Sequence, residues 1–165
     1  MKTEWRKKGC KKQSPLHYNW CGLDDVYLVS GFERVPAEKG YEEYGDGVVI
    51  QDLEGLHRAI AEHLVLTKKS LSGKEIRFLR ERMDLSQRGL ATLMRTTDQA
   101  VARWEKGQTN ISGPAEMLLR VLYMECVSKS IDVHALSNAL TLIDDVLTKR
   151  QLFTESDGKW MAVAA

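Results

Sequence analysis

Residues 85–107, LSQRGLATLMRTTDQAVARWEKG, decide the fold of this chain. Two short segments with apolar residues at helical spacing flank a tight connection, MRTT, at residues 94–97. Ser86 precedes the first segment, and Thr96 or Thr97 precedes the second. Hydroxyl side chains at these places cap helix N-termini by accepting a backbone hydrogen bond. The stretch therefore predicts two short helices joined by a tight turn.

The same spacing predicts which faces of the two helices are buried. The residues expected to face inward from the first helix are all apolar: Leu90, Ala91, Leu93 and Met94. Val101 and Trp104, three residues apart, are expected to face inward from the second helix. The residues expected to face outward from it are short or polar at the leading end and include two cations: Asp98, Gln99, Ala100, Arg103 and Lys106. Such a helix suits the DNA major groove, because small residues allow close approach and Gln or Arg pairs with base edges.

These residues resemble the phage-repressor (XRE) type of helix-turn-helix. The Leu-Ser-Gln opening at 85–87, the Leu-Ala pair at 90–91, the turn and the closing Trp-Glu-x-Gly at 104–107 recur in that family. The resemblance covers roughly residues 73–125 and implies a mainly α, five-helix domain that binds double-stranded DNA. Arg95 stands where the family usually has Gly, so a non-glycine residue is expected at positive φ, at a cost on the order of 1 kcal/mol. Thr96 replaces a usual apolar residue, so the recognition helix could begin one residue away from Thr97.

The wider chain resembles, more loosely, antitoxins of the MqsA and HigA kind. The stretches that carry this resemblance are CGLDDVYL at 21–28, VVIQDLEGLHRAI at 48–60 and GKW at 158–160. In that family a small N-terminal domain precedes the reading head, and the partner is an mRNA-cleaving toxin. Residues 14–69 contain five Lys/Arg and ten Asp/Glu, a balance that suits a small basic toxin. The alternative is that this unit only completes the fold or the dimer.

Length, composition and charge limit the size of the fold and the expected location and partners of the protein. A chain of 165 residues with 43% apolar residues is long enough for one core plus a small appended unit. No apolar run approaches the ~18 residues of a membrane span, and the N-terminus lacks a hydrophobic signal stretch, so a cytoplasmic protein without membrane contact is expected. The net charge of +1 conceals a basic segment at 1–13, with six Lys/Arg and one acid, and another at 70–110, with eight and five. A basic reading head suits contacts with DNA phosphates.

Neither a metal site, a cofactor site nor an enzyme is expected. Cys10, Cys21 and Cys126 are too few and too scattered for a disulfide framework or a zinc motif, so reduced thiols are expected. His57 and His63 are six residues apart, a spacing that does not bring two ligands onto one helix face, and both are interpreted as surface or capping residues. No phosphate-binding Gly-rich loop or nucleophile motif is present.

The N-terminal part is predicted to form a basic flexible arm, residues 1–13, and a small α/β unit, residues 14–66, which is the possible partner-binding unit. Apolar runs at 27–29 and 32–35 predict either one bent strand or two strands around a tight turn. The run at 48–50 is expected to pair with 32–35 across an exposed acidic loop, 36–47. Asp52 is expected to cap a helix with an apolar stripe: Leu53, Leu56, Ile60 and Leu64. The arm is either a disordered terminus or a tether to the DNA backbone.

The helix-turn-helix domain is predicted to span residues 72–149. Ser72 is expected to cap a helix that ends near Met83, in which Phe78 faces the N-terminal unit. Pro114 favours the start of the next helix, and residues 133–147 supply the fifth. The wide apolar stripe of that last helix is explained by a twofold mate or by burial within one chain. The tail, residues 150–165, either forms a hairpin around residues 156–158 or lies over the N-terminal unit.

These expectations combine into a sequence-specific repressor that acts as a homodimer on a palindromic operator, with the recognition helix at 97–106. The sharper hypothesis is the autoregulating antitoxin of a type II toxin-antitoxin pair; the alternatives are a free-standing regulator and an adaptor that has lost DNA binding. Gln99 and Arg103 are expected to contact base edges, and Ala100 allows close approach. Asp98 either accepts a hydrogen bond from cytosine or favours the helix dipole. The full set expected to contact DNA is Gln87, Arg88, Thr97, Asp98, Gln99, Ala100, Arg103, Lys106, Gln108 and Thr109.

Overall fold

The computed structural model describes residues 14–36, 47–127, 130, 132–142 and 150–163. The predicted basic arm, most of the acidic loop and the end of the last predicted helix, 143–147, lie outside these ranges. Six helices lie within the described part of the chain: α1 (Leu53–Thr67), α2 (Gly73–Arg82), α3 (Gln87–Leu93), α4 (Asp98–Glu105), α5 (Gly113–Cys126) and α6 (Val133–Leu142). The chain fits a mainly helical class, but the expected five-helix count is not confirmed.

The strands form two small sheets. They are β1 (Leu16–His17), β2 (Val26–Leu28), β3 (Phe32–Val35), β4 (Gly47–Ile50), β5 (Gln151–Ser156) and β6 (Lys159–Val163). The larger sheet has the order β1-β2-β5-β6, and β2 and β5 run parallel although they come from opposite ends of the chain. The tail therefore forms the predicted hairpin, which turns at Asp157 and Gly158, and this hairpin extends the sheet of the N-terminal unit.

The second sheet is the predicted antiparallel pair of β3 and β4, with Phe32 opposite Ile50. Gly31 separates β2 from β3 and has a φ of 78°. A Cβ atom at Gly31 would lie 2.5 Å from Glu155 Cβ and 2.5 Å from the Trp160 ring. Only glycine fits this close approach. Residues 26–35 are therefore two strands in two sheets and not one bent strand.

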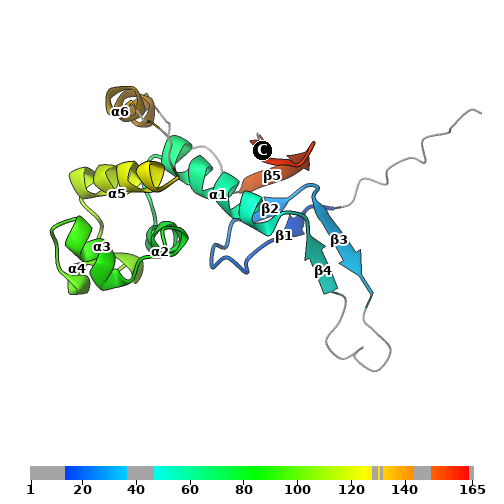
Figure 1. Cartoon of the computed structure of the whole chain (residues 1–165), viewed down its shortest axis with the longest axis horizontal. Coiled ribbons are helices and arrows are strands. Elements are labelled where there is room, and N and C mark those ends of the chain that lie inside the picture. The colour runs from blue at the N-terminus through cyan, green and yellow to red at the C-terminus, as the bar shows by residue number, and fades with distance from the viewer. Residues whose placement is uncertain (1–13, 37–46, 128–129, 131, 143–149, 164–165) are drawn as a thin grey trace, which may run out of the picture.

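Helix α1 lies between the larger sheet and the other helices (Figure 1). Its N-cap is Asp52, as predicted, which accepts a hydrogen bond from the Gly55 backbone N–H at 3.0 Å. Leu56, Ile60 and Leu64 are buried, but the prediction for Leu53 is wrong, because its side chain is exposed. Leu53 lies in the first turn of α1, one turn beyond the part of this face that is packed.

A buried arginine joins α1 to α5. The Arg120 guanidinium donates to the carbonyl oxygens of Leu64 and Val65, at 2.9 and 2.6 Å, and to that of Lys68 at 2.7 Å. These carbonyls belong to the end of α1, so Arg120 supplies hydrogen-bond donors that the helix itself lacks there. Glu116 lies 2.5 Å from the guanidinium and balances its charge. The N-terminal unit and the helices that follow are therefore joined through buried polar contacts.

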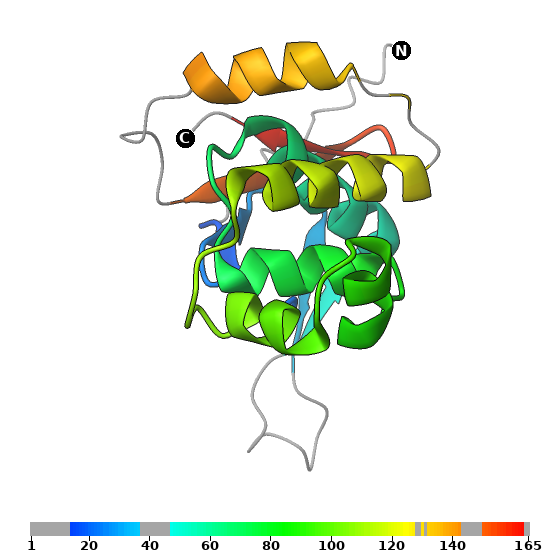
Figure 2. The ribbon, with the colours of Figure 1, turned by 90° about the vertical axis from the view of Figure 1, so that its left-hand side faces the viewer.

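Figure 2 shows α6 lying across the molecule above α5. The element it packs against most is α1. Leu136 and Leu140 are the buried residues of α6, whereas Val133 and Leu142 are exposed. The described part of the last predicted helix thus buries one stripe, and part of its apolar surface faces solvent.

Candidate nucleic-acid interface

Two hydroxyl residues begin the helices of the predicted pair. The Ser86 hydroxyl accepts from the Gly89 N–H at 2.9 Å and begins α3, as predicted. The Thr97 hydroxyl accepts from the Ala100 N–H at 3.1 Å, so Thr97 and not Thr96 is the N-cap of α4. The recognition helix is therefore Asp98–Glu105, with Thr97 and Lys106 as its caps.

The turn between α3 and α4 contains Arg95 in the left-handed region, with a φ of 51°, which confirms the prediction. The Thr96 N–H donates to the Ala91 carbonyl at 2.9 Å, and the Arg95 N–H donates to that of Thr92 at 3.3 Å. This pair of bonds is a Schellman motif, the usual helix ending that places glycine where Arg95 stands. It fixes the path of the chain from α3 into α4.

The packed sides of α3 and α4 follow the prediction with one exception. Leu90, Ala91 and Met94 are buried on α3, and Val101 is buried on α4. Leu93 is 52% exposed, so its predicted inward position is wrong. One residue turns an α-helix by about 100°, which carries the Leu93 side chain around from Met94 to solvent.

A buried carboxylate holds α2, α3 and α4 together. Glu105, at the end of α4, accepts from Arg80 Nε at 2.5 Å and from Gln87 Nε2 at 2.8 Å. Arg80 also donates to the Leu85 carbonyl at 2.6 Å. The side chains of Arg80 and Glu105 are only 11% and 4% exposed. This cluster, Arg80–Glu105–Gln87, fixes the recognition helix relative to the two helices behind it.

Sequence reasoning missed the roles of Arg80 and Glu105. Glu105 belongs to the Trp-Glu-x-Gly sequence, so the family resemblance contained a signal for it. Arg80 stands between Arg77 and Arg82, and this pattern of arginines fits phosphate contact and an ordinary solvated helix face equally well. In the structure Arg77 is exposed and pairs with Glu81 at 2.8 Å, while Arg80 is buried.

Gly73 brings the start of α2 against the end of α4. A Cβ atom at Gly73 would lie 2.5 Å from the Trp104 carbonyl oxygen and 2.6 Å from that of Glu105. Backbone atoms cannot yield as a flexible side chain can. Glycine is therefore required for this contact between α2 and the recognition helix.

The predicted DNA-contacting residues lie on α3, on α4 and in the loop after α4. The exposed members are Arg88, Thr97, Asp98, Gln99, Arg103, Lys106, Gln108 and Thr109. Ala100 is half-buried, and Gln87 is half-buried with its amide directed to Glu105. The Asp98 carboxylate accepts from the Gln99 N–H at 2.9 Å, which is the geometry of the helix-dipole interpretation.

The exposed charges of this surface are mainly positive. They are Arg88, Arg95, Arg103 and Lys106 against Asp98, because the carboxylate of Glu105 is buried against Arg80. No ion pair joins these four cations to a carboxylate in the described part of the chain. Unpaired cations around a helix with short leading side chains are what contact with DNA phosphates requires.

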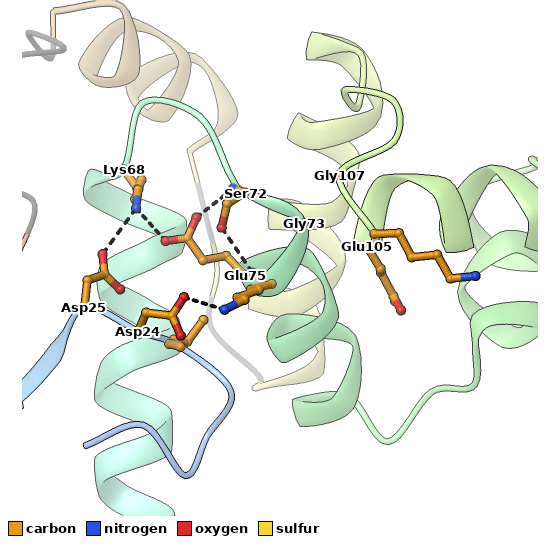
Figure 3. Close-up of a pocket in the computed structure, with 11 residues that line it drawn as sticks. Asp24, Asp25, Lys68, Ser72, Gly73, Glu75, Glu105 and Gly107 are labelled. Carbon is orange, nitrogen blue, oxygen red and sulfur yellow. Dashed lines mark hydrogen bonds and ion pairs between the residues drawn. The ribbon is translucent and has the colours of Figure 1, made fainter. Parts of the chain in front are cut away.

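A cleft of about 430 Å³ lies beside this surface, between the loop that precedes β2 and the end of α4 (Figure 3). Lys68 lies 2.6 Å from Glu75 and 3.7 Å from Asp25, and Lys74 pairs with Asp24. These three contacts between charged groups come from both units and neutralise much of the lining. The cleft is therefore lined by polar contacts between the N-terminal unit and the helices that follow it.

His57 on α1 connects the N-terminal unit to α2. Arg82 Nη1 lies 2.9 Å from His57 Nδ1, and the Tyr18 hydroxyl lies 2.7 Å from Nε2. Guanidinium only donates, so Nδ1 accepts and the Nε2–H donates to Tyr18. Burial, and then the charge of Arg82, lower the pKa of His57, while burial raises the pKa of Tyr18 to about 12. His57 is therefore a half-buried structural residue between the N-terminal unit and α2.

The described residues contain no group of three or more His, Cys, Asp or Glu side chains placed to hold a metal ion. None of the described helices is long and apolar enough to cross a membrane.

Comparison with known families gives one match. Residues 76–115 match the family model described as helix-turn-helix, which is of the XRE type. The matched residues include α3, α4, most of α2 and the start of α5. No curated protein matches the chain. No solved structure matches it either. A domain of this family is a DNA-binding regulatory domain, so the match indicates binding to double-stranded DNA and regulation of transcription.

Proposed function

We propose that this protein is a sequence-specific transcription repressor whose helix α4 enters the major groove of its operator. The observation that supports this most is the surface of α4, where Gln99 and Arg103 are exposed. The Arg80–Glu105–Gln87 cluster and the capped turn hold that helix from behind. Side chains that recognise bases need such a rigid support, because a hydrogen bond to a base edge depends on the direction of the side chain.

Each residue of the surface has an expected role. Gln99 and Arg103 contact base edges, and the small Ala100 allows the helix to approach. The residues proposed to contact phosphates are Arg88, Thr97, Lys106, Gln108 and Thr109. Gln87 acts by supporting Glu105, and Asp98 by favouring the N-terminus of α4.

The test compares two arginines of this surface. Arg103→Ala is expected to weaken binding to the operator by roughly 1 to 3 kcal/mol and to leave binding to random DNA almost unchanged. Arg88→Ala, the matched control, is expected to weaken binding to both DNAs equally and to reduce the slope of log K against log salt by about 1. Fluorescence anisotropy at several salt concentrations measures both. An equal loss for Arg103→Ala on operator and random DNA would mean that it contacts only phosphate.

The repressor is proposed to act as a homodimer on a palindromic operator. Paired half-sites about 34–36 Å apart are the usual target of helix-turn-helix proteins, and they require two reading heads related by a twofold axis. A stoichiometry of two chains per operator duplex is the expected result of a titration. A single chain bound to a single half-site would contradict it.

The narrower proposal is that this repressor is an autoregulating antitoxin that neutralises an mRNA-cleaving toxin. It rests on the sequence resemblance and on the acidic balance of residues 14–69, and the family match does not extend to it. The test is to express the chain with its genomic neighbour and to measure the mass of the purified assembly, with and without the promoter DNA of its own gene. A stable complex with a small basic protein that shifts this DNA supports the antitoxin. A protein that shifts the DNA without a partner is a free-standing regulator.

A further inference from the structure

The larger sheet has two faces, and α1 covers one of them. The strand registers place Leu28 beside Phe153, and both side chains are fully buried on this inner face. His63 of α1 contacts the Phe153 ring with ring centroids 5.6 Å apart. Trp160 of β6 belongs to the same face and donates to the Gln51 carbonyl just before α1. The inner face is therefore the core of the N-terminal unit.

The outer face is also apolar, but it is open to solvent. Tyr27, Leu152 and Val163 are cross-strand neighbours in one row, and Thr154 and Met161 are neighbours in the next. Val29, which continues β2, donates its backbone N–H to the Phe153 carbonyl at 2.7 Å and so extends this second row. Met161 is 51% exposed, and Val29 and Val163 are each 42% exposed.

This composition is unusual for a sheet that faces water. A half-exposed sheet normally alternates apolar and polar residues, whereas near-continuous apolar runs mark strands that are buried on both faces. The strand sequences are VYL at 26–28, followed by Val29, QLFTES at 151–156 and KWMAV at 159–163, and their apolar outward-facing residues are Tyr27, Val29, Leu152, Met161 and Val163. A contiguous apolar patch of this kind usually marks an interaction site.

The charges of the outer face indicate what covers it. Within the described residues they are Arg150, which lies 5.3 Å from the centre of the Tyr27 ring, and Lys159 at the hairpin end, and the titratable ring of His17 on β1 stacks on Tyr27 in the same row. A basic partner would find no countercharge among these groups, and an acidic partner would find cations only at the ends of the strands. Residues 1–13, with six Lys/Arg, have a composition that does not suit an apolar face either. A second copy of the same face is complementary, because apolar rows can meet across a twofold axis while Arg150, just before β5, and Lys159, at the hairpin, lie at the ends of the strands.

We propose that two copies of the chain associate through the outer face of the β1-β2-β5-β6 sheet. This proposal rests on the homodimer of the proposed function and names its surface. Figure 1 shows that α1 separates this sheet from α3 and α4, so the interface leaves the recognition helix free. It also gives the C-terminal hairpin a role, since β5 and β6 supply half of the interface.

The test places a charge on this face. Met161→Lys and Val29→Lys each put an ammonium into the centre of the interface, where a twofold axis would bring two like charges together. Sedimentation equilibrium without DNA is expected to give twice 18.7 kDa for the unchanged chain and 18.7 kDa for both variants at the same concentration. The matched control is Val49→Lys, because Val49 is 55% exposed on β4, in the other sheet, and this variant is expected to remain dimeric.

Circular dichroism and thermal unfolding of each variant separate loss of dimer from loss of fold. A monomeric unchanged chain, or folded variants that all stay dimeric, would overturn the proposed interface. Binding to promoter DNA is measured in parallel. If the unchanged chain is a dimer but does not bind promoter DNA, the proposed repressor is contradicted and the proposed interface is not. If the chain binds this DNA but Met161→Lys and Val29→Lys both remain dimeric, the interface is contradicted and the repressor is not.

Discussion

At the scale of single residues, three helix ends use the same backbone device. Asp84, Arg95 and Gly107 follow α2, α3 and α4, and all three have positive φ, at 55°, 51° and 66°. In each case the next residue donates to a carbonyl five positions earlier, as the Gln108 N–H does to Arg103 at 2.9 Å. Glycine adopts this conformation without strain, whereas the Cβ atom of Arg95 is placed close to its own backbone.

Arg95→Gly is therefore expected to raise the free energy of unfolding by roughly 1 kcal/mol. The strain is removed while both hydrogen bonds of the turn are kept. Urea unfolding at neutral pH measures the change. Arg95→Ala is the control, because it removes the guanidinium and keeps the Cβ, and it should show no gain. A loss of stability in the glycine variant would mean that the Arg95 side chain stabilises the turn.

At the scale of elements, the position of the recognition helix depends on Glu105. Its buried carboxylate is the counter-charge of Arg80 and the acceptor for Gln87. Glu105→Gln keeps the shape but removes the buried counter-charge of the Arg80 guanidinium, which is left with only the more exposed and more distant Glu81, 3.7 Å from its Nη2. We expect the free energy of unfolding to fall by about 3 to 5 kcal/mol.

The matched control for Glu105 is Arg77→Gln, which breaks the exposed pair between Arg77 and Glu81 on the same helix as Arg80 and leaves the partners of Arg80 in place. Exposed pairs of this kind contribute about 0.5 kcal/mol or less. Chemical denaturation of both variants gives the comparison. Similar small losses would show that solvent reaches Arg80 when its partner is removed. Replacing both Arg80 and Glu105 with apolar residues should recover much of the loss.

Local signals in the sequence predicted the elements well. The caps Asp52, Ser72, Ser86 and Thr97 have the predicted bonds, because an N-cap depends only on residues within one turn. Facing directions were less certain on short helices. In α3 four of the five residues 90–94 are apolar, so spacing alone does not separate the solvent side from the core, and Leu93 is wrongly predicted to face inward. The burial of polar residues is not predicted at all, because the sequence around Arg80 resembles a solvated face.

At the scale of the whole molecule, long-range pairing was the part that sequence patterns could not predict. The Ser30 hydroxyl donates to the Glu155 carbonyl at 2.9 Å across 125 positions. A parallel pair such as β2 and β5 has no turn residues to announce it, because its two strands are joined by the entire domain between them. The sequence of the tail therefore predicts either a hairpin or a segment over the N-terminal unit, and it does not predict the place of the hairpin in the sheet. The apolar outer face of that sheet could be identified only from the observed strand register.

Arg120 makes the two parts of the molecule depend on each other. It is fully buried on α5 and bonds three carbonyls at the end of α1, the helix that covers the larger sheet. Arg120→Met removes these donors and leaves Glu116 without its counter-charge, so we expect the free energy of unfolding to fall by about 3 kcal/mol or more. Arg58→Met, on the exposed side of α1, is the control and should change little.

Hydrogen exchange shows where the stability of the Arg120 variant is lost. Because α1 packs on the sheet and Arg120 anchors its end to α5, amides of β2 and β5 should lose protection together with those of α3 and α4. Increased exchange limited to α5 and the end of α1 would contradict this, because it would mean that the sheet and the reading head unfold independently. In the expected case, the sheet and the recognition helix belong to one cooperative unit, since α1 packs against buried aromatic residues of the sheet on one side and is bonded by the buried Arg120 of α5 at its end.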